Sequence, residues 1–288
     1  MITIQREKEL RAVIRQQKAQ GHRVALVPTM GNLHAGHIAL VKHALSVCDY
    51  VVTSIYVNPL QFGANEDLEK YPRTLDADKA KLVQAGNHAL FLPHTDQIYP
   101  NGLEQHTKVM VPNLTEDHCG ASRPGHFDGV TTIVNILFNL VQPDMAIFGE
   151  KDYQQLAVLR KMTKDLRLPI TIEGHATIRE SDGLAMSSRN GYLSATERKT
   201  ATILYQTLQD TAGKLKTAFK QRPGYADFAA LETDARAKLT AAGFRPDYYN
   251  IVASDTLLPA QSEDNEITIL AAAHLGTTRL IDNLSITL

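Results

Sequence analysis

Residues 24–47 constrain the fold most, because a buried strand there runs directly into a glycine-containing turn and a helix. The strand is the apolar run at residues 24–27, and the apolar spacing after the turn predicts the helix. The turn, residues 28–37, carries His34 and His37, which share one helix face at a spacing of three. Because a helix start has N–H groups without intrahelical partners, it suits an anion. We therefore predict that this turn holds the phosphates of a nucleotide.

Strands alternate with helices through the first part of the chain, which indicates β-α-β units with right-handed crossovers. The predicted fold class is α/β: a doubly wound, Rossmann-like parallel sheet. A further short strand is predicted at residues 107–111, inside an otherwise irregular segment. The alternating strands are predicted near residues 24–27, 50–57, 88–92, 145–148 and 170–178, and the helices at 5–20, 38–47, 76–84, 127–141 and 153–166.

The pattern changes after Ser194, where long helical segments precede strands. This order predicts a smaller C-terminal α+β domain. We place the domains at residues 1–177 and 178–288, the second acting as a lid. The predicted elements are helices at 195–219 and 225–242, a Pro/Gly break at 222–224, and strands at 248–253, 266–273 and 280–288.

Composition excludes several classes of protein. The 288 residues carry a net charge of −1, which gives no sign of nucleic-acid or membrane binding. Cys48 and Cys119 are far apart and match no metal or redox spacing, which favours a reducing compartment. The N-terminus lacks the apolar core of a signal peptide, and no apolar run is long enough to cross a membrane. We expect a cytoplasmic protein.

Polar clusters follow three of the predicted strands, at the rim where open parallel sheets bind ligands. They are residues 28–37, 58–61 and 149–155. Gln61 offers both donors and acceptors to a small polar ligand, and Lys151 offers a mobile charge to phosphate. A fourth cluster, residues 185–191, is interpreted as a mobile flap that closes over a triphosphate. Its hydroxyls and guanidinium come from Ser187, Ser188 and Arg189, with Gly183 and Gly191 as hinges.

Each cluster also has a plain structural interpretation. The two histidines can cap the helix, or form a zinc pair with a distant third ligand, although no Cys or His cluster supports zinc. Residues 58–61 can be an ordinary turn, residues 149–155 a helix capped by Asp152, and the flap a flexible surface loop. Residues 123–129 can be a helix entry or can bring a cation to the rim.

The motifs together resemble the pantothenate synthetases, a family of pantoate–β-alanine ligases. The resemblance covers essentially the whole chain. The histidine element alone recurs across the nucleotidylyl transferases and class I aminoacyl-tRNA synthetases, but the longer motifs together are specific. They are residues 28–37, 58–62, 71–73, 123–127, 148–155 and 182–190.

The resemblance implies a reaction in two steps. ATP and (R)-pantoate give pantoyl adenylate and pyrophosphate with Mg²⁺, and the β-alanine amine then displaces AMP. It implies a cytoplasmic homodimer, for which residues 94–125, with Leu103, Met110 and Val111, are a plausible contact surface. No metal-ligand set is predicted from the spacing, and Asp78 and Asp152 are the candidates for contacting magnesium.

The family's roles carry over to matching positions of this chain. Gln61, Gln155 and Asn58 fall at pantoate contacts, and Gln61 also serves β-alanine. Asn32 stands where the family commonly has a small or aromatic residue, without threat to the chemistry. His34, His37, Lys151, Ser187, Ser188 and Arg189 form the catalytic set, which stabilises phosphate charge. The ATP site comprises Met30, Gly31, Asn32, Leu33, His34, Ala35, Gly36, His37, Gly149, Glu150, Lys151, Asp152, Ile178, Met186, Ser187, Ser188 and Arg189.

Two other functions compete with a ligase. A nucleotidylyl transferase shares the histidine turn but leaves Gln61 and Gln155 without a role. A non-catalytic nucleotide sensor would not need every rim motif intact.

Overall fold

A computed structural model describes residues 1–63, 66–221 and 226–288. The chain forms two compact units, each described here by itself. The first comprises residues 1–116, 123–150 and 155–176, and the second comprises 117–122, 151–154 and 177–288. The second unit therefore includes two short segments that precede its main body in the sequence. The functional boundary after residue 177 stays a prediction.

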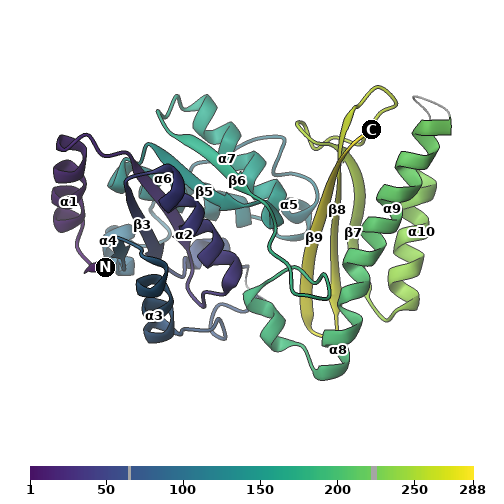
Figure 1. The fold of residues 1–288 in the computed structure, drawn as a ribbon, viewed down its shortest axis with the longest axis horizontal. Coiled ribbons are helices and arrows are strands. Elements are labelled where there is room, and N and C mark those ends of the chain that lie inside the picture. The colour runs from purple at the N-terminus through teal and green to yellow at the C-terminus, as the bar shows by residue number, and fades with distance from the viewer. Residues whose placement is uncertain (64–65, 222–225) are drawn as a thin grey trace. The chain divides into compact units, whose positions relative to one another are not determined.

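The first unit contains a six-stranded sheet in the order β1-β4-β3-β2-β5-β6. Strands β3, β5 and β6 of this sheet are labelled in Figure 1. Every neighbouring pair is parallel. The predicted Rossmann-like α/β class is thus confirmed. The edge strand β1 was not expected from the sequence. Strands β3, β4 and β6 are shorter than their predicted ranges, whereas β2 and β5 extend beyond theirs. The strands are β1 (Ile2–Ile4), β2 (Val24–Thr29), β3 (Tyr50–Ile55), β4 (Ala89–Phe91), β5 (Met145–Gly149) and β6 (Thr171–His175).

Helices cover both faces of this sheet. Helix α2 packs on β2, β3 and β5, while α1 packs on α6, which lies against β2. The central strands therefore carry apolar side chains on both faces, and residues 24–27 are fully buried. The helices of this unit are α1 (Glu7–Ala19), α2 (Ala35–Val47), α3 (Leu75–Ala85), α4 (Thr95–Ile98), α6 (His126–Val141) and most of α7 (Tyr153–Asp165), with short 3₁₀ turns η1 (Pro59–Gln61) and η2 (Glu150–Asp152).

The strand order reverses at β2. From β2 the chain proceeds to β3 and β4 on one side, and later to β5 and β6 on the other. Ligands of doubly wound sheets bind beside the carboxyl ends of the strands at such a switch point. The histidine turn follows β2 and residues 149–150 end β5, so both predicted clusters lie where the topology favours a ligand.

The strand predicted at residues 107–111 is wrong, because no strand is assigned to these described residues. The backbone of Val109 forms hydrogen bonds with side chains of helix α6 instead of with a neighbouring strand. The N–H of Val109 donates to Oγ1 of Thr132, and the carbonyl of Val109 accepts from the Thr131 hydroxyl. Two threonines of α6 thus take the hydrogen bonds that a neighbouring strand would have made.

The second unit contains a three-stranded antiparallel sheet in the order β7-β8-β9. Helices α9 and α10 pack on it and on each other around a continuous apolar core (Figure 1). The smaller α+β unit is therefore confirmed, and the predicted helix at 195–219 is divided at Ala201. The elements are α5 (Cys119–Ser122), η3 (Ser188–Tyr192), α8 (Ala195–Thr200), α9 (Thr202–Gln221), α10 (Phe228–Ala241), β7 (Arg245–Ala253), β8 (Glu266–Leu275) and β9 (Thr278–Thr287).

The predicted Pro/Gly break at 222–224 and the predicted start of the next helix at Tyr225 lie outside the described residues. Across the described part of the chain, no helix combines the length and the apolar character needed to cross a membrane.

Candidate active site

A buried carboxylate shapes the turn between β2 and α2. Gly31 has a φ of +84°, and Asn32 a φ of 50°, so the chain reverses through the left-handed region. The turned backbone points inward: the N–H groups of Asn32 and Leu33 donate to the two carboxylate oxygens of Asp78, at 2.9 and 2.8 Å. The Thr74 hydroxyl donates to the same carboxylate. Asp78, only 1% exposed, therefore fixes the turn from α3.

His34 and His37 form a reciprocal cap at the start of α2. Nδ1 of His34 accepts the N–H of Gly36 at 3.1 Å, and Nδ1 of His37 accepts the N–H of His34 at 3.3 Å. The rings lie 4.0 Å apart between centroids. An Nδ1 that accepts a hydrogen bond carries no proton, so each neutral ring has its N–H at Nε2. The capping interpretation is therefore correct, and it fixes both rings as Nε2–H donors.

Asn58 positions Gln61. Asn58 is 1% exposed, and its Oδ1 accepts from the Tyr99 hydroxyl at 2.7 Å. Its Nδ2 donates to the Gly129 carbonyl and to Oε1 of Gln61, at 3.1 and 3.2 Å. Nε2 of Gln61 approaches Sδ of Met30 at 3.1 Å. The Gln61 amide therefore lies beside Met30, a residue of the turn at 28–37, with its orientation set by Asn58.

Arg123 and His126 hold the backbone of Gln61. Arg123 forms a two-pronged ion pair with Glu66, both distances being 2.6 Å, and also donates to Nε2 of His126. Nδ1 of His126 donates in turn to the Gln61 carbonyl at 2.8 Å. Arg123, which the sequence suggested as a cation at the rim, thus helps to anchor η1.

Gly129 lets η1 lie directly on α6. A Cβ at this position would overlap the backbone of Leu60 and Gln61. The close approach of Gln61 to the helix therefore requires glycine here.

The residues after β5 belong to both units. Gly149, Glu150 and Gln155 lie in the first unit, and all three are half-buried. Lys151 and Asp152 belong to the second unit, where Nζ of Lys151 lies 3.8 Å from the Asp152 carboxylate. Lys151 is the more enclosed of the two, with side-chain exposures of 18% and 48%.

The predicted flap is a braced hairpin. The N–H of Met186 donates to the Ile178 carbonyl at 3.0 Å, and Arg179 pairs with Ala185 across an antiparallel bridge. Oγ of Ser187 accepts the N–H of Arg189 and caps η3, which begins at Ser188. Ile178, which is predicted to line the ATP site, and the predicted flap are thus joined directly. The hinges at Gly183 and Gly191 stay a prediction.

Arg179 and Asp282 form the ion pair that braces this hairpin. The guanidinium makes two parallel hydrogen bonds to the carboxylate, at 2.7 and 2.9 Å, and stacks 3.5 Å above the Tyr205 ring. Burial raises the pKa of the Asp282 carboxyl, against the opposing effect of Arg179. Such two-pronged Arg–carboxylate pairs fix orientation as well as distance.

The acidic residues of the site form no dedicated metal cage. Among the described residues, no group of three or more His, Cys, Asp or Glu side chains could hold a metal ion. Asp78 uses both its oxygens on backbone N–H groups, whereas the Asp152 side chain is half-exposed. Mg²⁺ that binds with nucleotides usually takes one or two carboxylates and completes its shell with phosphate and water. Asp152 fits that pattern and Asp78 does not.

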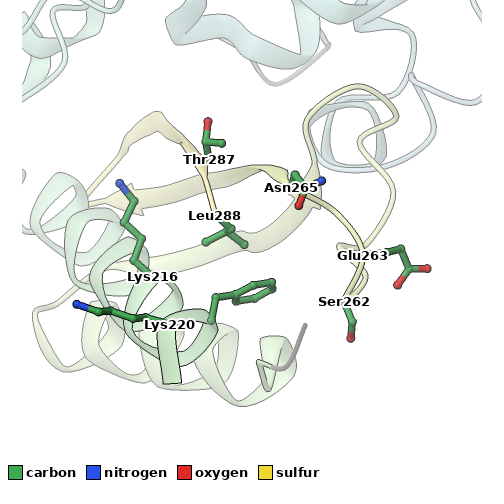
Figure 2. Close-up of a pocket in the computed structure, with 8 residues that line it drawn as sticks. Lys216, Lys220, Ser262, Glu263, Asn265, Thr287 and Leu288 are labelled. Atoms are coloured by element: carbon green, nitrogen blue, oxygen red, sulfur yellow. The ribbon is translucent and has the colours of Figure 1, made fainter. Parts of the chain in front are cut away.

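The second unit also has a cavity of about 410 Å³ (Figure 2). Lys216 and Lys220 extend from one helix beside it, while Ser262 and Glu263 lie on a loop opposite. None of the predicted site residues lines it, so it has no part in the predicted chemistry.

Comparison with known proteins decides the family. Residues 2–285 match the family described as pantoate-beta-alanine ligase. The chain belongs to this family. It is 68% identical to a pantothenate synthetase of Hahella chejuensis over 99% of both chains, and 58% identical to one of Marinobacter nauticus over the full length of both.

Solved structures give the same family. The pantothenate synthetase of Thermus thermophilus matches with a TM-score of 0.90 and 44% identity over 99% of both chains. A pantoate-beta-alanine ligase of Francisella tularensis, solved with beta-gamma ATP and beta-alanine, matches with a TM-score of 0.79 and 30% identity. That match covers 99% of this chain and 97% of the other.

Sequence reasoning missed the residues that hold the site. Asp78 was considered only as a magnesium candidate, and Glu66, Arg179, Asp282 and Asn283 were given no role. One signal was available: the adjacent polar residues 282 and 283 lie between Leu280-Ile281 and Leu284 in the predicted strand. The ligand contacts of the predicted site residues remain predictions.

Proposed function

We propose that this protein condenses (R)-pantoate with β-alanine at the expense of ATP, through a pantoyl-adenylate intermediate. The observation that carries this proposal is the family match over residues 2–285, which spans every rim motif. A carboxylate does not acylate an amine at neutral pH without activation, and in this proposal the attachment of AMP supplies that activation.

The first step is an in-line displacement. A pantoate carboxylate oxygen attacks the α-phosphorus, and the bond to the β-phosphate oxygen breaks to release pyrophosphate. Such a step depends mainly on positioning and charge stabilisation. We assign phosphate stabilisation to the Nε2–H groups of His34 and His37, the Lys151 ammonium, and the loop residues. The loop residues are Ser187, Ser188 and Arg189.

Some backbone N–H groups of the turn before α2 are not available to phosphate. Those of Asn32 and Leu33 are turned inward to Asp78, so they do not face phosphate. Binding at this turn is therefore assigned to the imidazoles and to the remaining ATP-site residues there. In neutral rings, the two histidines stabilise charge by donating hydrogen bonds rather than by carrying a charge.

The second step takes place at the acyl carbon. The β-alanine amine attacks this carbon, the bond to the AMP phosphate oxygen breaks, and the amine loses a proton. We assign pantoate to Gln61 and Gln155, and β-alanine to Gln61. Asn58 orients Gln61 through the hydrogen bond between their side chains. In the first step, Mg²⁺ would be held by the ATP phosphates and Asp152, where it would supply neutralising charge.

The remaining parts of the proposal concern organisation. We propose residues 1–177 as the nucleotide- and pantoate-binding domain, 178–288 as the lid, and a cytoplasmic homodimer. Met110, 70% exposed, supports a contact surface in residues 94–125, whereas Val111 is buried and does not contribute to it. Light scattering after size exclusion tests the dimer, and a monomer at all concentrations would contradict it.

The function is tested with purified protein, ATP, pantoate and β-alanine. The expected result is AMP and pyrophosphate, formed only when both organic substrates are present. Pantoate alone should support ATP–pyrophosphate exchange. Release of ADP would overturn the ligase mechanism. Exchange that ignores pantoate would favour a nucleotidylyl transferase, and ATP binding without turnover would favour a sensor.

A further inference from the structure

Two adjacent polar residues of β9 are buried. Asp282 and Asn283 are 4% and 7% exposed. Successive residues of a strand point to opposite faces. Asp282 therefore shares a face with Leu280 and Ile286, which belong to the core beneath α9, while Asn283 points to the other face. One strand thus presents a buried polar side chain to each side of the sheet.

On the core face, Asp282 holds the hairpin at residues 178–189, which carries Ser187, Ser188 and Arg189. Its ion pair with Arg179 places the guanidinium within reach of two carbonyls. Arg179 donates to the Gly183 carbonyl at 3.1 Å and to the Asn283 carbonyl at 3.3 Å. The hairpin is therefore bound to β9 through Arg179, which also holds the Gly183 carbonyl of the same hairpin.

On the opposite face, Asn283 holds the turn that carries Lys151. Its Nδ2 donates to the Lys151 carbonyl at 2.9 Å. The N–H of Asn283 donates to Oδ1 of Asp282 at 2.8 Å, so the two side chains belong to one network. Tyr153 and Gln154 add anchors for the same segment, on the Ser254 and Asp117 carbonyls.

We propose that Asp282 and Asn283 are positioning residues that fix the Lys151 turn and the Ile178–Arg189 hairpin as one phosphate-binding surface. They touch neither substrate nor reacting atoms. The inference rests on the proposed function, because it takes both elements as phosphate-facing. A buried ion pair adds little net stability over apolar residues of equal volume, so the contribution of this network is to geometry.

The test uses isosteric and conservative variants in the full chain: Asn283→Asp, which loses the amide donor, Asp282→Asn, and Arg179→Lys. Two half-reactions are measured separately. Pantoate-dependent ATP–pyrophosphate exchange needs the triphosphate held correctly, whereas aminolysis of supplied pantoyl adenylate by β-alanine does not. The expected result is a loss of about ten- to a hundredfold in exchange, with aminolysis close to the wild-type rate.

The same strand supplies a matched control. Arg279 and Asp247 form a second partly buried pair at 2.8 Å, with 19% and 23% exposure, that reaches Ser122 and not the phosphate elements. Arg279→Lys and Asp247→Asn should lower the melting temperature while leaving the exchange-to-aminolysis ratio unchanged. If the three test variants also keep that ratio, the inference is overturned. If wild-type protein lacks pantoate-dependent exchange, the proposed function fails instead.

Discussion

The turn at residues 28–37 and the hairpin at residues 178–189 are both expected to face phosphate, yet their backbones are held differently. The turn directs backbone N–H groups inward, and a buried acceptor, Asp78, receives them. The hairpin directs the Gly183 carbonyl to the half-buried guanidinium of Arg179, which the buried Asp282 carboxylate holds in place. In each region the buried charge serves the backbone, and the proposed ligand contacts belong to other side chains. Predictions below are ordered by expected size.

Replacing Asp78, which accepts the N–H groups of the turn, should have the largest effect, and that effect is on stability. Asp78→Ala leaves the N–H groups of Asn32 and Leu33 buried without an acceptor, which costs about 3–5 kcal/mol in the free energy of unfolding. Urea titration measures this cost. Asp76→Ala, an exposed change in the same first turn of α3, should cost less than about 1 kcal/mol. Equal losses for the two variants would show that Asp78 does not fix the turn.

A substitution at His37 should separate the contribution of the histidine cap to stability from its contribution to catalysis. In His37→Asn, the amide oxygen can replace Nδ1 as acceptor for the His34 N–H, but the Nε2–H donor is lost. Pantoate-dependent exchange should fall about a hundredfold, as for removal of one preorganised donor. The melting temperature should stay near that of wild type, as measured by calorimetry. An unchanged single-turnover rate would remove His37 from the catalytic set.

Replacing a glycine by alanine should have opposite effects on stability at one position in each unit. Gly129→Ala pushes η1 away from α6, at a cost of about 1–3 kcal/mol in unfolding free energy. KM for pantoate should rise as Gln61 moves. Gly213→Ala, in α9 with no atom near the new Cβ, should instead stabilise the protein by about 0.5–1 kcal/mol. A neutral Gly129→Ala would mean that η1 has room to shift.

The smallest effect concerns the exposed end of the hairpin. Hydrogen bonding from Arg198 lowers the pKa of the Asp182 carboxyl below its ordinary 3.8. The contribution of this pair is therefore complete above that pH and is lost as pH falls through the lowered pKa. Because both side chains are substantially exposed, it amounts to less than about 1 kcal/mol. The melting-temperature difference between wild type and Asp182→Asn should shrink from pH 7 to pH 2, and a constant difference would contradict this.

Local pattern was sufficient for most of the fold. Buried runs such as residues 24–27 identify parallel strands, because such strands are apolar on both faces. The sequence pattern predicted a strand wrongly where side chains of a helix take the backbone hydrogen bonds that a neighbouring strand would have made. At residues 107–111 the sequence has strand character, but Thr131 and Thr132 of a helix take the hydrogen bonds. The edge strand β1 was missed because three residues carry too little periodicity to be recognised.

For the candidate site, motifs identified the residues expected to meet ligand and some of those that hold them, such as Asn58 and His126, but not Asn283. Gln61 and Lys151 lie in compact motifs near strand ends. Some of their supports come from distant positions: His126 reaches Gln61 from 65 residues away, and Asn283 reaches Lys151 from 132 residues away. A polar residue at such a distance has no local signature, because its partner is determined only by the tertiary fold.

The hydrogen bond between Asn283 and Lys151 also sets an order of assembly. During synthesis, the Lys151 turn emerges long before the strand that secures it, since β9 spans Thr278–Thr287. A nascent chain can form much of its parallel sheet while the Lys151 turn still lacks its partner. Nucleotide affinity should thus appear only after β9 has been made, and truncation just before Asp282 should abolish it more readily than it unfolds the parallel sheet.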